Sequence, residues 1–245
     1  MLKTKIEIGI VLALSLGASA VYSLISLIAK LSAPEGLASS TTTINRQLAE
    51  REWLDFSYQF LGIVFGLAPV ALVLYLLWRD GGSPFKLIGF DFAKPSQDFI
   101  RGVLLAASIG IPGLGLYVAS RVLGLSSQVI PADLASYWWT IPILLLAAAK
   151  AAALEEVVVV GYLFKRLSEL GLGSWSQIIF SALLRASYHL YQGFGGFLGN
   201  LVMGAVFGWL YQRWGRVMPL VFAHFLLDAA IFVGYAAVGH LLPLP

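Results

Sequence analysis

The stretch that decides the fold runs from Trp138 to Phe164 and reads WWTIPILLLAAAKAAALEEVVVVGYLF. It is long and apolar enough to cross a bilayer, yet Glu155 and Glu156 lie side by side inside it. A single carboxylate near the centre of a membrane costs about 2.5–3.5 kcal/mol on insertion scales, and such groups are retained mainly for function. Two adjacent carboxylates therefore indicate an intramembrane site that handles water, protons or a metal ion.

The composition places the whole chain in a membrane. Of the 245 residues, 59% are hydrophobic and only 12% are charged, and the mean hydropathy is +0.83. A soluble domain carries about 25% charged residues. The absence of cysteine excludes disulfides, thiolate metal sites and cysteine nucleophiles. The net charge of +3 is small and the basic residues cluster in loops, so we expect no nucleic-acid partner.

Apolar stretches predict seven membrane spans and therefore an all-α polytopic bundle. The predicted spans are Ile6–Ala29, Phe56–Trp78, Phe99–Leu123, Trp138–Phe164, Trp175–Tyr191, Phe197–Tyr211 and Val217–Tyr235. We expect a polar cavity among the last four of them. No internal repeat or low-complexity linker interrupts residues 1–245, so we expect a single transmembrane domain. The charged segment from Arg46 to Asp55 fits an amphipathic helix on the membrane surface.

The beginning of the chain has features of both a signal peptide and a membrane anchor. Lys3 and Lys5 precede an apolar run, and Ala18-Ser19-Ala20 resembles a signal-peptidase site. The apolar run continues past that site to Ala29, which favours an uncleaved anchor.

Lysine and arginine counts predict the orientation of the spans. With the N-terminus inside, the inner segments hold ten cations, namely Lys3, Lys5, Arg79, Lys86, Lys94, Arg101, Lys165, Arg166, Arg213 and Arg216. The outer loops hold four, namely Lys30, Arg46, Arg51 and Arg121. This asymmetry predicts a cytoplasmic N-terminus in a multi-pass protein of the cell membrane. We expect that membrane to be the inner membrane of a bacterium.

Two histidines also fall within apolar helical stretches. His189 follows Arg185 by four residues and His224 precedes Asp228 by four, so the members of each pair share a helix face. A carboxylate one turn from an imidazole fixes its tautomer and raises its basicity. Counted from the inner ends of their spans, Glu155, His189 and His224 lie in the central to inner part of the membrane, which permits one shared site.

Lys150 and Arg185 are the remaining cations inside predicted spans. Because intramembrane charges usually pair, they are the expected partners of Glu155, Glu156 and Asp228. Consecutive helical residues project about 100° apart, so we expect one glutamate to face the reaction centre and the other to support a neighbour. The alternative is a salt bridge that only holds the bundle together.

Small residues follow one face of the sixth span. Gly196, Asn200, Gly204 and Gly208 recur every four residues, which is typical of close helix packing. Asn200 can make an interhelical hydrogen bond or line a cavity as a donor.

The block from Glu155 to Asp228 resembles the CPBP family of CAAX proteases and bacteriocin-processing enzymes, also called the Abi family. The resemblance rests on Glu155-Glu156 followed by Gly161-Tyr162-Leu163-Phe164, the helix ending in His189, Phe207-Gly208-Trp209-Leu210-Tyr211, and His224-x-x-x-Asp228. It covers about a third of the chain. The first 135 residues are similar to the family only in being hydrophobic spans.

The resemblance implies that Glu155 and His189, with Glu156 beside them, activate the attacking water. It implies that His224 and Asp228 bind a metal or stabilise the oxyanion, because family members are described both as metalloproteases and as metal-free glutamate proteases. A divalent metal such as zinc would take Glu155, His189 and His224 as ligands and keep an open water position. Without a metal, a desolvated Glu155 would act as general base. An ionised Asp228 cannot donate to an oxyanion but can orient His224, which slightly favours the metal.

The sequence departs from the family pattern at three positions. Val160 stands where the family usually has arginine, Arg185 where it usually has phenylalanine, and Asp228 where it often has asparagine. We therefore predict that Arg185 replaces the missing arginine from a neighbouring helix and neutralises Glu156 or Glu155.

The leading interpretation is an intramembrane endopeptidase that acts on a peptide or a membrane-protein substrate. The family name refers to prenylated substrates and so suggests a lipidated one. Membrane lipid is the other expected partner. One alternative is a catalytically silent relative that acts as a binding or bacteriocin self-immunity protein, to which Val160 gives weight. A second alternative is a proton-coupled transporter, since ionisable groups inside spans also form proton relays. Transporters of that kind often contain inverted repeats, which this sequence lacks.

Overall fold

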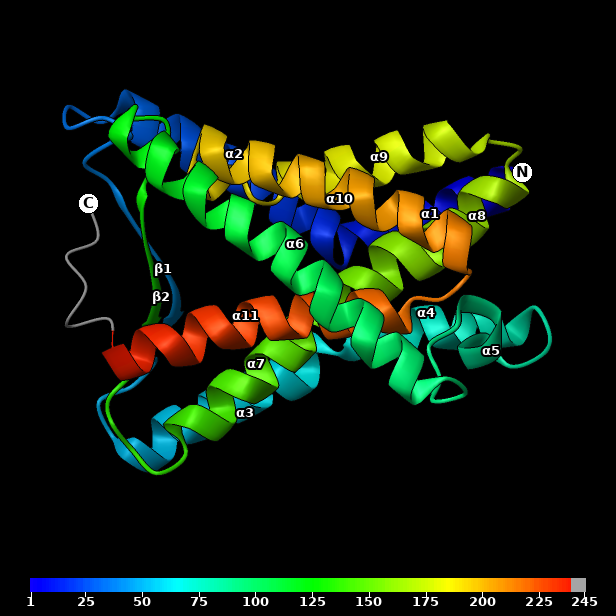
Figure 1. Ribbon diagram of the computed structural model, residues 1–245, viewed down its shortest axis with the longest axis horizontal. Coiled ribbons are helices and arrows are strands. Elements are labelled where there is room, and N and C mark those ends of the chain that lie inside the picture. The colour runs from blue at the N-terminus through cyan, green and yellow to red at the C-terminus, as the bar shows by residue number, and fades with distance from the viewer. Residues whose placement is uncertain (239–245) are drawn as a thin grey trace.

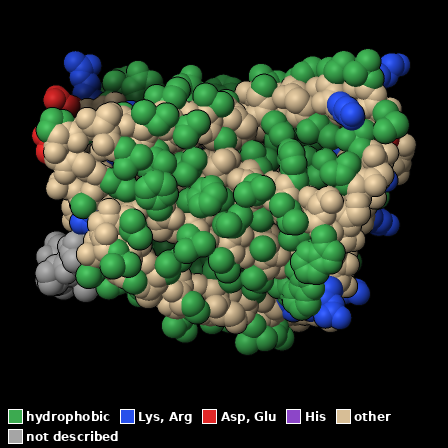
Figure 2. All heavy atoms as spheres, turned by 90° about the horizontal axis from the view of Figure 1, so that it is seen from above, with side chains coloured by type: hydrophobic (Ala, Val, Ile, Leu, Met, Phe, Trp, Pro, Cys, Tyr) green, Lys and Arg blue, Asp and Glu red, His purple; other side chains and the backbone are tan. Residues whose placement is uncertain are grey.

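The fold is a helical membrane bundle, seen in a computed structural model that describes residues 1–238. About 75% of the residues are helical, so the predicted helical class is confirmed. The helices lie mostly along the longest axis of the molecule (Figure 1). Hydrophobic side chains cover the middle of the face drawn in Figure 2, while lysine and arginine lie toward the two ends of that axis.

The elements follow one another along the chain with short connections. They are α1 (Leu2–Ala13), α2 (Leu16–Ser32), β1 (Thr41–Arg46), α3 (Glu52–Gly66), α4 (Ala68–Arg79), α5 (Pro84–Ile88), α6 (Pro95–Val122), β2 (Gln128–Asp133), α7 (Thr140–Glu155), the π-helix η1 (Glu156–Tyr162), α8 (Leu163–Glu169), α9 (Ser174–Ser187), the 3-10 helix η2 (Leu190–Gln192), α10 (Phe194–Trp214) and α11 (Met218–Val238).

Within the described residues, four helical segments are long and apolar enough to cross a membrane, namely Glu52–Arg79, Pro95–Val122, Phe194–Trp214 and Met218–Ala237. A fifth candidate is the pair α1 and α2, which meet at an angle of 53°. These five correspond to five of the seven predicted spans. The protein is therefore a multi-pass membrane protein, but the prediction of seven spans is not confirmed.

The other two predicted spans are the ones that contain most of the candidate site. Trp138–Phe164 is divided into α7, η1 and the start of α8, and Trp175–Tyr191 contains α9, which has 14 residues. At a rise of 1.5 Å per residue, α9 is about 21 Å long, whereas the hydrocarbon core is about 30 Å thick. Polar side chains lie in both stretches, and neither stretch is among the candidate spans of the described residues.

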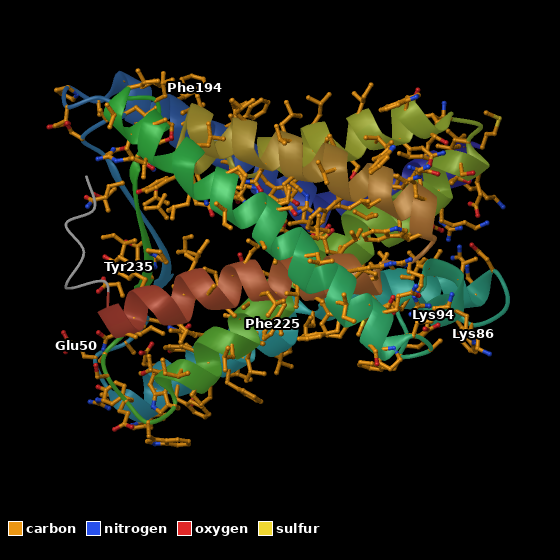
Figure 3. The ribbon with its side chains drawn as sticks, in the orientation of Figure 1. Glu50, Lys86, Lys94, Phe194, Phe225 and Tyr235 are labelled. Carbon is orange, nitrogen blue, oxygen red and sulfur yellow. The ribbon has the colours of Figure 1, made fainter. Side chains whose placement is uncertain are left out.

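Two short strands were not predicted. Strands β1 and β2 pair in parallel, with Thr41 opposite Gln128 and Arg46 opposite Asp133. They lie at the end of the molecule that also holds the labelled Glu50 and Tyr235 (Figures 1 and 3). The predicted surface helix Arg46–Asp55 is wrong, because that segment ends β1, continues as a loop and enters α3 at Glu52. The strands satisfy one another's backbone hydrogen-bond donors and acceptors in the part of the chain that lies between helices.

Ion pairs join the helices at the opposite end, where the labelled Lys86 and Lys94 lie (Figure 3). The side chain of Arg166 is 3% exposed and contacts three carboxylates, those of Glu7, Asp80 and Glu169. Arg216, between α10 and α11, contacts Asp91 at 2.8 Å and Asp98 at 2.6 Å. The ends of α4, α8 and α10 and the beginnings of α1 and α6 meet here (Figure 1). The segments that hold the ten cations predicted to be inner thus lie at one end of the bundle.

Glycines bring α9 and α10 into close contact. A Cβ atom built on Gly204 would lie 2.8 Å from the Cα of Ala182 and 3.2 Å from the side chain of Arg185. A Cβ on Gly208 would lie 3.0 Å from the ring of Phe164. The predicted packing role of these two glycines is therefore confirmed, and Gly204 lets α10 approach the part of α9 that carries Arg185.

We predict that Gly204→Ala destabilises the protein by about 1–3 kcal/mol, because a methyl group has no room against α9. The matched control is Gly62→Ala in α3, where nothing lies within 4 Å of a new Cβ. Alanine favours helix there, so this variant should be as stable as wild type or slightly more stable. Thermal unfolding in one detergent measures both, and equal melting temperatures for the two variants would refute the packing argument.

The ion pairs of Arg216 predict a pH dependence of stability. The backbone N–H of Ala93 and the guanidinium of Arg216 both donate to Asp91, and they lower the pKa of its carboxyl below the usual range. A carboxyl group with a lowered pKa in the folded state stabilises the fold at every pH above its unfolded-state pKa of about 4. This contribution to the free energy of unfolding is lost as the pH falls through the folded-state pKa.

The melting temperature of wild type should therefore exceed that of Asp91→Asn by a constant amount above about pH 5, and the gap should shrink below about pH 4. Asp133→Asn, which changes an exposed aspartate at the end of β2, is the control. A gap that is the same at every pH would show that Asp91 stabilises the fold without its charge.

Candidate active site

The site begins where a run of four valines follows the two glutamates. Glu155 ends α7 and Glu156 begins η1, in which residues 157–162 are all buried. β-Branched side chains crowd the preceding turn of an α-helix, and π-helical turns are frequent at functional sites. The hydroxyl of Ser181 on α9 donates to the carbonyl of Val159 at 3.1 Å, which satisfies one backbone group of this widened turn.

Arg185 lies between the two glutamates. Its Nη1 is 3.2 Å from Glu155 Oε2 and its Nη2 is 2.6 Å from Glu156 Oε1, and its side chain is fully buried. The guanidinium also lies over the ring of Phe207, 5.4 Å from the centroid. Val160 belongs to the same buried cluster as Phe207. The arginine expected at position 160 and the arginine present at position 185 thus share one neighbourhood.

The ion-pair network is not optimised for stability alone. Within the described residues, Glu156 Oε2 and Arg185 Nε are buried and have no hydrogen-bond partner. An unsatisfied buried polar group costs about 1–3 kcal/mol. A pair kept only to hold helices together would be expected to satisfy these atoms.

Tyr188 completes the surroundings of Glu155. Its hydroxyl donates to Glu155 Oε2 at 2.8 Å, and the residue is 4% exposed. The sequence analysis did not predict a role for Tyr188. The feature that could have indicated one is its position next to His189, at the end of a helix that contains polar residues. Two donors therefore hold Oε2, while Oε1 accepts no hydrogen bond from the part of the chain that the structure describes. The Glu155 side chain remains 11% exposed.

His224 lies between two carboxylates. Its Nδ1 is 2.7 Å from Glu156 Oε1 and its Nε2 is 3.5 Å from Asp228 Oδ2. A carboxylate is acceptor-only when ionised, so this arrangement fits an imidazole that carries a proton on each nitrogen. Phe225, the next residue, lies on α11 between the two ends of the molecule (Figure 3).

His189 has a different environment. Its Nδ1 is 3.0 Å from the carbonyl oxygen of Arg185. Since a carbonyl only accepts, Nδ1 carries the proton and Nε2 of the neutral ring keeps a lone pair. The side chain is half-buried. The ring is therefore held in the tautomer that can take up a proton at Nε2.

The structure leaves two of the candidate residues outside this network. The Asn200 amide donates to the carbonyl of Gly196 on its own helix at 3.0 Å, so among the described residues it makes no interhelical hydrogen bond. Among residues 1–238, Lys150 makes no ion pair or hydrogen bond, so the expected pairing falls to Arg185 alone.

The polar cavity predicted among the last four spans is not confirmed. Two pockets of about 370 and 380 Å³ lie elsewhere and contain none of the candidate site residues. The first is lined by Phe85, Phe90, Asp91, Phe92 and Met218. Water access to the site therefore rests on the partial exposure of Glu155, His189 and Asp228.

The expected metal ligands do not form a metal site in this arrangement. Among the described residues, no three side chains of histidine, aspartate or glutamate are grouped so that they could hold a metal ion. Both nitrogens of His224 face acidic oxygens, and Nδ1 of His189 faces a carbonyl. The metal stays a prediction of the sequence.

Comparison with known proteins gives one match. Residues 137–230 match the family model described as type II CAAX prenyl endopeptidase Rce1-like. No curated protein and no solved structure matches the chain. The matched region is less than half of the chain and contains Glu155, Arg185, His189 and His224. The resemblance drawn from the sequence is thus confirmed for this region: residues 137–230 have the signature of the Rce1-like endopeptidases, a part of the CPBP family.

Proposed function

We propose that the protein is an intramembrane endopeptidase in which Glu155 and His189 activate the attacking water. The observation that carries the proposal is the convergence of two glutamates, an arginine and a histidine from α7, η1, α9 and α11 in one buried network. Intramembrane ionisable groups are costly and usually functional. The match of residues 137–230 to an endopeptidase family supports the same reaction class.

Glu155 suits the role of general base. Arg185 and Tyr188 hold its Oε2, so its Oε1 points with a fixed orientation and is free to accept a proton from water. His189 Nε2 supplies a second proton acceptor, because Nδ1 of the same ring donates to the carbonyl of Arg185. Proton transfer to a positioned side chain contributes about 10²–10⁴-fold to a rate.

The other half of the network suits charge stabilisation. In a doubly protonated His224, Nε2 lies 3.5 Å from Asp228 Oδ2, which is longer than an ordinary hydrogen bond, so its N–H can donate to the oxyanion that forms when water adds to the peptide carbonyl. Its Nδ1 donates to Glu156, and Asp228 orients the ring from the other side. The C–N bond then breaks, and the proton taken from water passes from Glu155 or His189 to the leaving amine. Atoms and charge balance without a further reactant.

The family name supplies the substrate class to test first, which is a peptide with a prenylated cysteine near its C-terminus. The end of the bundle that holds Lys86 and Lys94 is proposed as the cytoplasmic face, because the segments that hold the cations predicted to be inner meet there (Figure 1). We propose that the protein lies in a bacterial inner membrane with its N-terminus inside.

A catalytically silent relative remains the second candidate, because both glutamates are engaged in ion pairs and Val160 lacks the family's charge. A proton-coupled transporter finds no support in the family match, which describes an endopeptidase.

We predict that Glu155→Gln lowers hydrolysis of a prenylated fluorogenic peptide by about 10²–10⁴-fold, because an amide cannot take the proton from water. The protein is assayed in detergent or liposomes with the prenylated peptide and its unprenylated counterpart. The control is Glu50→Gln, the same change at an exposed glutamate in the loop between β1 and α3, which should keep full activity.

Equal hydrolysis by wild type and Glu155→Gln would refute the proposed role of Glu155. A folded wild type that hydrolyses neither peptide would favour the silent relative.

We predict that Arg185→Phe loses activity and stability, because removing one partner of a buried ion pair costs about 3–5 kcal/mol. The double variant Val160→Arg with Arg185→Phe should retain more activity than Arg185→Phe, since it returns a cation to the neighbourhood of Phe207. Val160→Arg alone and Arg185→Lys are measured beside them, with melting temperatures to separate folding from chemistry. Equal activity loss in the double variant and in Arg185→Phe would show that position 160 cannot supply the charge.

A further inference from the structure

His189 lies in the segment Tyr188–Gly193, which joins α9 to α10 and contains the short helix η2. Because α9 ends at Ser187, the carbonyl groups that follow it have few helical partners. A catalytic histidine in such a connection needs other contacts to hold its position.

Helix α2 supplies two of these contacts. The hydroxyl of Ser23, which is 5% exposed, donates to the carbonyl of Tyr188 at 2.7 Å. The ammonium of Lys30 donates to the carbonyl of Tyr191 at 2.6 Å. These two carbonyls flank His189 in the chain, so α2 holds the segment on both sides of the histidine.

Strand β1 and the residue just before β2 supply two more contacts. Thr42 of β1 donates from its hydroxyl to the carbonyl of Tyr191 at 3.1 Å. The backbone N–H of Ser127 donates to the carbonyl of Gln192 at 3.0 Å. Both side chains are buried, and their hydroxyl groups are 2.7 Å apart. We call Ser23, Lys30, Thr42 and Ser127 the cradle of His189.

Lys30 is the charged member of the cradle. Besides Tyr191, its ammonium donates to the hydroxyl of Thr42, and it contacts no carboxylate among residues 1–238. A half-buried lysine that pairs only with a carbonyl and a hydroxyl is not placed there by an acidic partner. A cation near the carbonyl end of a helix interacts favourably with the helix dipole.

We propose that Lys30 is a positioning residue for His189, acting through Tyr191 and Thr42. Every residue of the cradle lies before residue 137 and hence outside the matched family region. The N-terminal part of the chain therefore sets the geometry of the catalytic part, in addition to crossing the membrane. This inference rests on the proposed function, because it assigns His189 a role in catalysis.

The test compares Lys30→Met, Lys30→Arg and the control Lys150→Met. Lys150 is a second half-buried lysine of the bundle that makes no ion pair or hydrogen bond with the described residues. Three readouts are taken on the full-length protein: kcat and KM for the prenylated peptide, hydrogen exchange of the segment 188–193, and the signals of isotope-labelled histidine. The chain has three histidines, and His189→Ala assigns the signal of interest.

Lys30→Met should lower kcat per folded molecule by about ten- to a hundredfold, since a displacement of about 1 Å can cost that much. KM should stay within about twofold, because Lys30 is not placed against the substrate. The segment 188–193 should exchange faster and the His189 signal should move. Lys30→Arg keeps a donor at this position and should restore kcat to within a few-fold, and Lys150→Met should resemble wild type.

Two results would overturn the proposal. One is an unchanged kcat, exchange rate and His189 signal in Lys30→Met. The other is an equal loss in Lys30→Met and Lys30→Arg together with a lower melting temperature, which would mean a role in stability only. If the wild-type protein hydrolyses no peptide, the proposed function fails, while exchange and the histidine signal still decide whether Lys30 holds the segment.

Discussion

The structure depends on the placement of Arg185 between Glu155 and Glu156. Two carboxylates on adjacent residues in an apolar bundle repel each other and lose their hydration, and either effect alone would destabilise the fold. The guanidinium compensates both, because its fork reaches one oxygen of each glutamate from a different helix. The same contacts leave one oxygen of Glu155 free and place His224 on Glu156. One ion-pair network thus holds α7, α9 and α11 together and defines the candidate site.

Much of the fold could be predicted because composition and apolar length report the membrane directly. The helical class and five of the spans followed from these properties, and the ten cations predicted to be inner fall in segments at one end of the bundle. The two stretches that are not confirmed as spans, around Glu155 and Arg185, contain the polar groups of the candidate site. The strands β1 and β2 could not be predicted, since pairing between residues 41–46 and 128–133 leaves no periodic signal in either segment.

The site was predicted in part for a similar reason. Buried charges such as Glu155, Arg185 and His224 are conspicuous in an apolar sequence, and their pairing follows from the cost of isolated charge. Tyr188 and Ser23 are ordinary residues of membrane helices, so nothing in their type marked them. Their contribution comes from tertiary contacts, and in the case of Ser23 from a contact 165 residues away in the chain.

The length of α9 has a consequence for how a substrate could reach the site. A helix of 14 residues cannot match the thickness of the hydrocarbon, so the lipid beside it must thin or admit headgroups and water. A transmembrane segment that diffuses in the bilayer keeps its backbone hydrogen bonds because hydrocarbon offers no competing partner. Beside α9 that protection is reduced, and a segment arriving laterally can unwind there and present an extended peptide bond. Under the proposed function, the shortness of one helix makes the local membrane part of the route to hydrolysis.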